Sequence, residues 1–197
     1  MTAIRSATLQ DLPGVYRVCL QTGDSGRDAT SLYRNPDLLG HVYAGPYVVG
    51  EPDLAFVVAD DLGVAGYTFA AADSRAFEAW AELEWWPGLR EQYPVEAGDS
   101  PDAQVIRLLH APERAPEAIL ADYPAHLHID LLPRVQGKGF GRLLVERVLG
   151  RLRECGVPGV HLGVAADNSG AIEFYRHLGF STLAVDDDSE LMALRLP

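Results

Sequence analysis

A glycine-rich turn, residues 136–141, is the stretch whose residue types most directly suggest a bound ligand. It reads Gln-Gly-Lys-Gly-Phe-Gly and joins an apolar segment, 125–132, to an amphipathic segment, 142–154. Three glycines within five residues allow a ligand to approach the backbone closely. A helix that begins here offers unpaired N–H groups and the positive end of its dipole. This combination predicts a binding site for a phosphate or pyrophosphate.

Two widespread phosphate-binding motifs are absent from the sequence at this turn and at the start of the chain. The turn lacks the Gly-Lys-Ser/Thr ending of a P-loop, and the chain does not open with the G-x-G-x-x-G of a dinucleotide-binding fold. The side chains of Lys138 and Arg142 could add positive charge to the predicted site. Equally, they could be solvated, with only their backbone N–H groups facing the ligand.

The net charge limits the classes of partner. The chain has 28 acidic and 16 basic residues and a formal net charge of −12. This balance argues against nucleic acid, because neutralising phosphates requires Lys and Arg. It is compatible with a cationic amine substrate, although solubility alone also accounts for it. Only the segment 134–153 is basic, with Glu146 as its one acidic residue, so the basic patch surrounds the glycine-rich turn.

The cysteines and the apolar runs indicate the compartment. Cys19 and Cys155 have no Cys-x-x-Cys neighbour, so we expect buried, reduced thiols and no metal or redox site. The N-terminus lacks the charged-then-apolar pattern of a signal segment, and no apolar run approaches the ~20 residues of a membrane span. We therefore expect a soluble, cytoplasmic protein with no membrane partner.

The hydrophobic periodicity predicts an α/β chain that forms a single domain, 1–197. A hairpin covers 54–70, and Gly179 ends the last helix in the position that glycine favours. We expect 47–49 to be extended and 73–123 to be an insertion of helices and loops. The remaining strands are predicted at 2–8, 125–132, 160–164, 181–185 and 191–196, and the remaining helices after Asp11, within 29–42, over 142–154 and after Asn168.

Two blocks in this order of elements resemble the GNAT superfamily of acyl-CoA-dependent N-acyltransferases. In the first, 131–144, Pro133 precedes the family's pattern of Gln or Arg, two residues, Gly, one residue and Gly. The second, 168–180, matches Asn-x-x-Ala-x-x-Phe-Tyr-x-x-x-Gly-Phe. The hairpin, the Trp-rich insertion and 123–133 are also similar to bacterial acetyltransferases that resemble the C-terminal acetyltransferase-like domain of O-GlcNAcase. That domain is regarded as having lost the acyl-CoA signature, which this chain retains.

The resemblance implies an α/β GNAT fold with a mixed, mostly antiparallel sheet flanked by helices. Two splayed strands, at Leu131 and Leu162, would form the acyl-CoA cleft. Acetyl-CoA would be the co-substrate, without a metal, and a small-molecule or peptide amine would be the acceptor. A monomer and a homodimer both remain open. The cofactor-binding residues that it implies are Leu131, Leu132, Gln136, Gly137, Lys138, Gly139, Phe140, Gly141, Arg142, Asn168, Ala171 and Tyr175.

The resemblance also implies catalytic roles. The backbone N–H groups of Leu131 and Leu132 would polarise the thioester carbonyl. The Tyr175 phenol would protonate the departing CoA thiolate as a general acid. Structural alternatives exist, because Asn168 would also serve as a helix cap and Tyr175 as a core aromatic residue.

The general base is not identified by the resemblance. His126, His128 and Asp130 alternate along one predicted strand and so share a face, which makes them candidates. A bulge near Leu131, usual in this family, would break that alternation. A chain of water molecules without a single base is the alternative. Acceptor specificity would come from 24–52 and from the insertion, whose tryptophans could line a groove but more simply pack on the core.

The sequence therefore predicts acetyl transfer from acetyl-CoA to a primary amine by direct attack. One competing hypothesis is a module that binds acetyl-CoA without turnover. Another is an acyl-CoA hydrolase, although we identify no positioned water and base for it in the sequence.

Overall fold

A mixed seven-stranded sheet runs through the part of the chain that the computed structural model describes, residues 1–95 and 97–197. Its strand order is β1-β2-β3-β4-β5-β7-β6, and every neighbouring pair is antiparallel except β4 and β5. The predicted mostly antiparallel sheet is thus confirmed. The strands are β1 (Ala3–Ser6), β2 (Ala55–Asp60), β3 (Gly63–Ala71), β4 (Ala125–Leu131), β5 (Gly159–Ala165), β6 (Ser181–Val185) and β7 (Ser189–Arg195).

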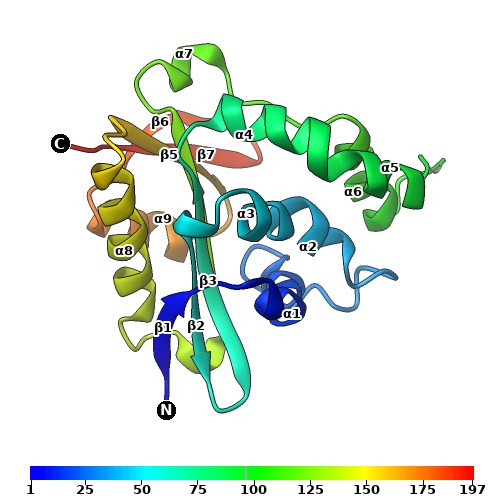
Figure 1. Cartoon of the computed structure of the whole chain (residues 1–197), viewed down its shortest axis with the longest axis horizontal. Helices are drawn as coiled ribbons and strands as arrows, with labels where there is room; N and C mark the ends of the chain where they lie inside the picture. The colour runs from blue at the N-terminus through cyan, green and yellow to red at the C-terminus, as the bar shows by residue number, and fades with distance from the viewer. Residues whose placement is uncertain (96) are drawn as a thin grey trace.

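Helices cover both faces of this sheet (Figure 1). On one face lie α8 (Phe140–Glu154) and α9 (Ser169–His177). On the other lie α1 (Leu12–Thr22), α2 (Leu38–Tyr43) and α3 (Gly45–Gly50). No helix in the described ranges has both the length and the apolar character that crossing a bilayer requires. The insertion adds α4 (Ser74–Trp80), a π-helical segment (Ala81–Trp85), α5 (Trp86–Gln92), α6 (Pro101–His110) and α7 (Glu117–Leu120).

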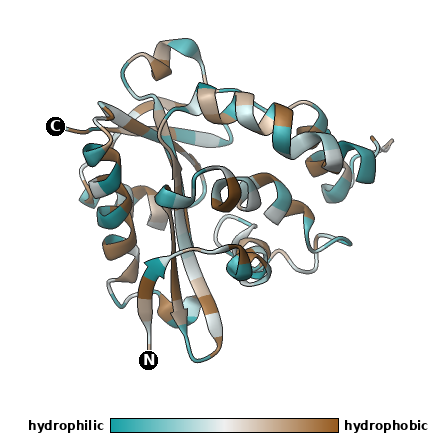
Figure 2. Ribbon diagram, viewed as in Figure 1, coloured by the Kyte–Doolittle hydropathy of each residue, from teal (hydrophilic) through white to brown (hydrophobic). Residues whose placement is uncertain are grey.

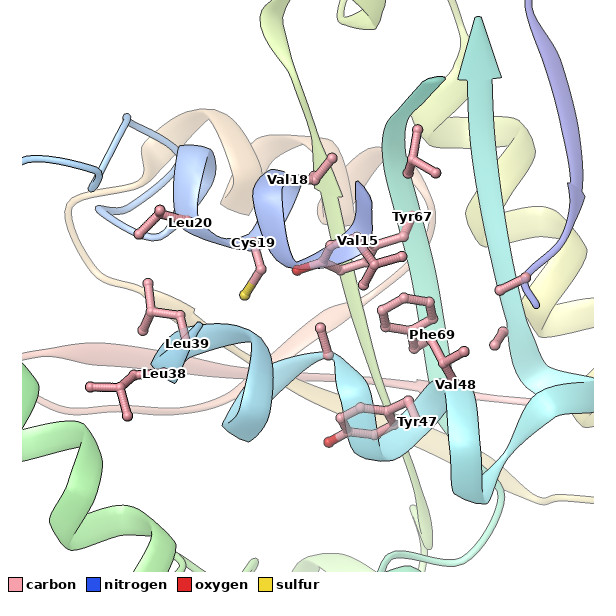
Figure 3. Packing of buried hydrophobic residues seen from close by; sticks show 14 of the residues in the cluster. Val15, Val18, Cys19, Leu20, Leu38, Leu39, Tyr47, Val48, Tyr67 and Phe69 are labelled. Carbon is pink, nitrogen blue, oxygen red and sulfur yellow. The ribbon is translucent and has the colours of Figure 1, made fainter. Parts of the chain in front are cut away.

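Each face of the sheet has its own apolar cluster. The stripe of α8 that includes Leu144, Val148 and Leu152 is fully buried against one face, as its four-residue spacing predicts. Figure 2 accordingly shows both hydrophobic and hydrophilic positions along α8. On the other face, α1 and α3 pack on β3, where Tyr67 and Phe69 lie stacked with ring centroids 4.3 Å apart, and α2 packs on α1 and α3 (Figure 3).

The strands β4 and β5 separate soon after they begin. Their parallel pairing comprises only Ala125 with Val160 and His126 with His161. By contrast, β4 pairs with β3 from His126 to Leu131, and β5 pairs with β7 along its whole length. The backbone edges that face each other beyond His126 are therefore left without a strand partner, which confirms the predicted splay.

Two local predictions are wrong, and the bulge that would break the alternation along β4 is not found. Residues 47–49 belong to α3 rather than to an extended piece, because Pro46 lies in its first turn and Tyr47 and Val48 are buried against the sheet. The bulge near Leu131 is absent from the regular pairing of β4 with β3. Cys155 is exposed just after the end of α8 instead of buried.

Candidate active site

The glycine-rich turn lies between β4 and α8, and after Gln136 its backbone N–H groups have no acceptor among the described residues. Within the described chain, Gln136 donates to Pro133 and the next backbone donor with a protein acceptor is Leu143, which donates to the Gly139 oxygen at 3.1 Å. In the described ranges, the six N–H groups of 137–142 therefore lie at the start of a fifteen-residue helix without a protein acceptor. This is the arrangement that favours an anion.

Glycine is favoured at the three positions of this turn for different structural reasons. Gly137 and Gly139 have φ angles of 69° and 82°, which side-chain-bearing residues rarely adopt. A Cβ added to either would have open space around it, so backbone conformation alone favours glycine there. Gly141 is buried, and a Cβ would lie 3.2 Å from the Leu131 side chain and 3.3 Å from Phe174. The last glycine thus lets α8 approach both β4 and α9.

The basic side chains of this region already have partners in the protein. Lys138 Nζ donates to the Arg134 carbonyl at 2.7 Å, and Arg142 Nε lies 2.6 Å from a carboxylate oxygen of Glu146. Arg134 binds Asp60 at 2.8 Å and so fixes the turn to the β2–β3 hairpin. Lys138 and Arg142 are exposed, and their side chains can reorient toward a ligand at little cost.

The free edge of β4 presents alternate backbone groups to the cleft. Leu132 N donates to the Ala65 oxygen at 2.8 Å, so the even-numbered residues of β4 bond β3. The intervening residues Ile129 and Leu131 direct their N–H and C=O groups to the opposite side, toward β5. The Leu131 carbonyl accepts from Gln136 Nε2 at 2.7 Å. The N–H of Leu131 therefore faces the cleft, whereas that of Leu132 is engaged.

Helix α9 brings three of the predicted residues to the other side of the cleft. The Asn168 side chain caps the helix by accepting from Ala171 N at 3.1 Å. Tyr175 is buried, and burial raises the pKa of its phenol. No group of the described residues bonds its hydroxyl, yet no fully enclosed side-chain oxygen there lacks a partner, so this hydroxyl reaches a surface accessible to water. Phe174 is half-buried and packs on the same apolar cluster.

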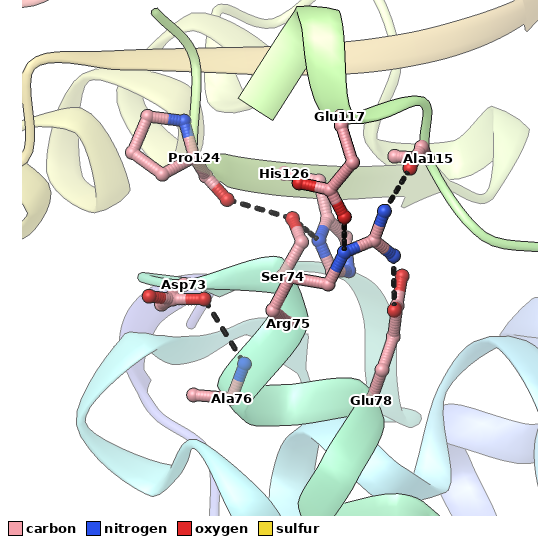
Figure 4. A network of polar contacts seen from close by, with 9 residues as sticks. All are labelled: Asp73, Ser74, Arg75, Ala76, Glu78, Ala115, Glu117, Pro124 and His126. Atoms are coloured by element: carbon pink, nitrogen blue, oxygen red, sulfur yellow. Dashed lines mark hydrogen bonds and ion pairs between the residues drawn. The ribbon is translucent and has the colours of Figure 1, made fainter. Parts of the chain in front are cut away.

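A chain of hydrogen bonds joins β4 to α3 and α4. Tyr47 Oη lies 2.8 Å from His126 Nε2 and 2.9 Å from His128 Nε2. On the other side of its ring, His126 Nδ1 lies 2.7 Å from Ser74 Oγ, and the Ser74 hydroxyl donates to the Pro124 carbonyl at 2.7 Å (Figure 4). The even-numbered face of β4 is thus tied to the two helices that cover it.

Burial keeps this chain neutral. Desolvation lowers the pKa of His128 to about 4, with a smaller contribution from His161. It lowers the pKa of His126 well below its ordinary value, with smaller contributions from His128 and His161. Burial also raises the pKa of the Tyr47 phenol. Near pH 7 the two imidazoles are therefore uncharged.

Asp130 shares the face of the two histidines but belongs to a separate contact. Tyr67 Oη donates to Asp130 Oδ2 at 2.6 Å. Burial raises the pKa of Asp130 to about 6, although hydrogen bonds from Tyr67 and Thr22 oppose the shift. The carboxylate is held by a fully buried tyrosine and does not line the cavity that adjoins His126 and His128.

A cavity of about 310 Å³ adjoins the point where β4 and β5 separate. Its inner wall contains the imidazoles of His126, His128 and His161. His161 Nδ1 lies 2.8 Å from the Tyr123 carbonyl oxygen, which fixes this ring against the start of β4. Because Leu162 of β5 also lines it, the cavity and the cleft meet at the same pair of strands.

The outer wall of the cavity carries charge from the insertion. Glu78 pairs with Arg75, which also binds Glu117 and the Ala115 carbonyl (Figure 4). Glu82 of the π-helical segment pairs with an arginine of α5 at 2.5 Å. Among the described residues, Glu113 has no side-chain partner. Acidic groups therefore outnumber the one cavity-lining arginine, Arg114.

The tryptophans of the insertion mainly pack, as expected. Trp80 and Trp85 lie against the apolar cluster under α2, and Trp85 Nε1 donates to the His41 carbonyl at 2.9 Å. Trp86 is buried and also lines the cavity. The insertion thus has two roles, covering the sheet and forming the outer wall.

One family model matches the chain over these same elements. Residues 67–180, from β3 through α9, match the acetyltransferase (GNAT) family. The match covers more than half of the chain and includes the splayed strands, the glycine-rich turn and Tyr175. The chain belongs to the GNAT family. Its resemblance to that family, drawn from two sequence blocks, is therefore confirmed.

Two curated relatives match parts of this GNAT chain. Protein O-GlcNAcase of Rattus norvegicus is 28% identical over 185 residues, which are 92% of this chain and 20% of that protein. Mycothiol acetyltransferase of Nocardia farcinica is 38% identical over 84 residues, which are 36% of this chain and 28% of that protein. The chain thus spans about a fifth to a quarter of the length of these relatives.

Solved structures share the whole architecture. The crystal structure of SsHAT superposes with a TM-score of 0.92 at 40% identity and covers 100% of this chain and 98% of that one. YncA of Salmonella typhimurium, solved with its cofactor acetyl-CoA, superposes with a TM-score of 0.59 at 18% identity, covering 100% and 94%. The GNAT fold is shown by both.

Three residues of this site could not be predicted from the sequence. Tyr47 falls in a segment predicted to be extended, and nothing in its neighbours signals a contact with residues 79 and 81 positions away. Ser74 has no sequence signal beyond its position near the start of a helix. His161 lies opposite His126 only through the pairing of β4 with β5. In each case the tertiary arrangement brings the residue to the site.

The low pKa of His128 predicts how stability depends on pH. The unfolded chain binds a proton to this ring below about pH 6.5, whereas the folded imidazole does so only near pH 4. Stability therefore falls as the pH drops from 6.5 to 4, and His128→Gln should remove part of that fall, on the order of 2 kcal/mol. Urea unfolding of the wild type and of His128→Gln at pH 4.5 and pH 7.5 measures this change in the free energy of unfolding. An equal pH dependence in the two proteins would contradict the shift.

Proposed function

We propose that this GNAT chain transfers the acetyl group of acetyl-CoA to a primary amine by direct attack. The observation that carries the proposal is the meeting of the β4–β5 cleft with a cavity lined by neutral imidazoles. Acetyl-CoA would enter the cleft from the side of α8, and the amine would enter from the side of α4. The two reactants would then meet at the end of the strand pairing without a covalent enzyme intermediate.

The donor side uses backbone groups. The unbonded N–H groups of 137–142 would hold the pyrophosphate of the cofactor, and the free edge of β4 would pair with its pantetheine amides. The Leu131 N–H would donate to the thioester carbonyl and stabilise the oxyanion that forms during attack. Leu132, whose N–H is bonded to Ala65, supports the strand instead.

The acceptor side favours a cation at its entrance and a neutral amine at its inner end. The acidic groups near the rim, including Glu113, would attract an ammonium ion. Burial among aromatic and imidazole side chains disfavours charge, so the amine would lose its proton as it reaches the thioester. Its nitrogen would then attack the carbonyl carbon, and the carbon–sulfur bond would break as the intermediate collapses.

Tyr175 is proposed as the general acid. Its raised pKa keeps the phenol protonated at neutral pH, and its hydroxyl has no partner among the described residues to compete with the thiolate. The phenol would give its proton to the sulfur of the departing CoA and recover one from solvent. Asn168 and Ala171, at the start of the same helix, would contact the pantetheine chain.

The assay for this function is release of the CoA thiol with a panel of amines and peptides. Tyr175→Phe should lower kcat by about 10²- to 10⁴-fold, the usual range for a positioned general acid. Its affinity for acetyl-CoA, measured by calorimetry, should stay within a few-fold of the wild type, because the ring remains. Thiol release at background with every amine would instead favour a binding module without turnover. A large loss of acetyl-CoA affinity in Tyr175→Phe would indicate instead that Tyr175 has a packing role.

Binding of the cofactor pyrophosphate by the glycine-rich turn can be tested separately. Gly139→Asp places a carboxylate and a strained left-handed backbone where the pyrophosphate would bind, so acetyl-CoA affinity should fall by at least about tenfold. The matched control is Gly150→Ala, because Gly150 lies inside α8 and a Cβ there has open space. Calorimetry with acetyl-CoA measures both variants, and circular dichroism checks folding. Unchanged affinity in a folded Gly139→Asp protein would contradict the role.

A further inference from the structure

We propose that His128 is the base that takes the proton of the attacking amine, and that Tyr47 and Ser74 position it by fixing its tautomer. The proposal rests on the acetyl transfer proposed above. It is carried by the hydrogen-bond chain from Pro124 through Ser74, His126 and Tyr47, which ends at the cavity-lining ring of His128.

The direction in which hydrogen bonds are donated along this chain is set by the group at its start, the Pro124 carbonyl. The Pro124 carbonyl can only accept, and the single hydroxyl proton of Ser74 is donated to it. Ser74 Oγ must therefore accept from His126, so His126 carries its proton on Nδ1. In a neutral ring the other nitrogen, Nε2, is then an acceptor.

The hydrogen bonds of Tyr47 set the tautomer of His128 at the end of the chain in the same way. His126 Nε2 accepts the hydroxyl proton of Tyr47, so the Tyr47 oxygen is left to accept from His128 Nε2. His128 then carries its proton on Nε2, and its Nδ1 holds a lone pair. A base requires this tautomer, since a protonated Nδ1 would meet the amine as a donor.

The opposite polarity is less favourable by one hydrogen bond. If Ser74 donated to His126 Nδ1, every later donor in the chain would reverse and His128 would present N–H at Nδ1. The bond between the Ser74 hydroxyl and Pro124 would then be lost, while the other bonds would only exchange donor and acceptor. The Pro124 carbonyl, four hydrogen bonds along the chain from His128, therefore selects the tautomer of that ring.

The Nδ1 atom of His128 is free and accessible. No group in the described ranges bonds it, and no fully enclosed side-chain nitrogen there lacks a partner, so this atom reaches the cavity that His128 lines. Both nitrogens of His126 are engaged by Tyr47 and Ser74. Asp130 is held by Tyr67 and does not line the cavity.

His161 is the competing imidazole, and its position is less favourable. Its Nδ1 bonds the Tyr123 carbonyl, which also leaves Nε2 unprotonated in the neutral ring. However, His161 pairs with His126 in the last contact between the two strands and is only 6% exposed. His128 is the first residue of its face beyond that contact, where the cleft has opened and a thioester has room.

The proton transfer is balanced within the site. As the amine nitrogen bonds to the carbonyl carbon, it becomes positively charged and its N–H becomes acidic. His128 Nδ1 takes that proton, and Tyr47 stabilises the imidazolium by accepting from Nε2. The proton leaves to solvent through the cavity, and Tyr175 separately supplies the proton of the CoA thiol.

The first test is a double-variant cycle measured as kcat with a good amine acceptor. Tyr47→Phe should lower kcat by about 10- to 100-fold, and Ser74→Ala by about fivefold, with KM for acetyl-CoA within twofold of the wild type. Adding Ser74→Ala to Tyr47→Phe should cost less than about twofold more, because the chain is already broken. The matched control is Tyr16→Phe, which removes a tyrosine hydroxyl bonded to His41 Nδ1 at 3.0 Å, away from the cavity that His128 lines, and should keep wild-type kcat. If the kcat losses of the two single variants multiply in the double variant, or if Tyr47→Phe keeps wild-type kcat, the proposal is overturned.

The second test reads the tautomers directly by ¹⁵N NMR of histidine-labelled protein, assigned with His126→Gln, His128→Gln and His161→Gln. His128 should be protonated on Nε2 and His126 on Nδ1 at pH 7, and the His128 signal should become a mixture in Ser74→Ala. A His128 ring protonated on Nδ1 would overturn the proposal, as would normal turnover in His128→Gln. These outcomes differ from failure of the proposed function, in which the wild type would acetylate no amine although the tautomers were as stated.

Discussion

The early end of the parallel pairing between β4 and β5 is the constraint on which the rest of this site depends. Two residue pairs join the strands, and beyond them each strand is held only by its outer neighbour. Unpaired backbone groups inside a sheet are costly unless another partner satisfies them. The cleft is therefore a built-in position for an extended ligand with amide groups, at the centre of the molecule.

The two faces of β4 divide the chemistry. Its odd-numbered side chains, such as Leu127, pack under α8 and α9, while its even-numbered side chains point to α1, α3 and α4. Because the pairing with β3 has no bulge, this alternation holds from His126 to Leu131. The apolar face supports the helix that begins at the glycine-rich turn. The polar face supplies imidazoles to the cavity, so in the proposed reaction the donor and the acceptor would approach one strand from opposite sides.

The parts of this arrangement that could be predicted are those encoded locally. The stripe of Leu144, Val148 and Leu152 on α8 needs only a helical period, and the turn before it needs only glycines at positions of positive φ. The splay of β4 from β5 has no local signal, and its prediction came from the likeness of two sequence blocks to a known family.

The remaining errors and omissions have a tertiary cause. Apolar residues 47–49 suit a strand by composition, but packing over Phe69 and Phe77 places Tyr47 on a short helix. The hydroxyl of Tyr47 acquires its two histidine partners only through this packing. The alternation of His126, His128 and Asp130 predicts a shared face but not the different partners of each. Which of them is free to accept a proton depends on Ser74 and Tyr67, each at least 50 residues away in sequence.

A crystal structure with bound acetyl-CoA tests the central claim most directly. We predict pantetheine amides paired with the free edge of β4 between β4 and β5, the pyrophosphate on the N–H groups of 137–142, and the acetyl carbon facing the cavity beside His128. Acetyl-CoA bound elsewhere on the surface, with the cleft between the two strands filled by side chains, would contradict it.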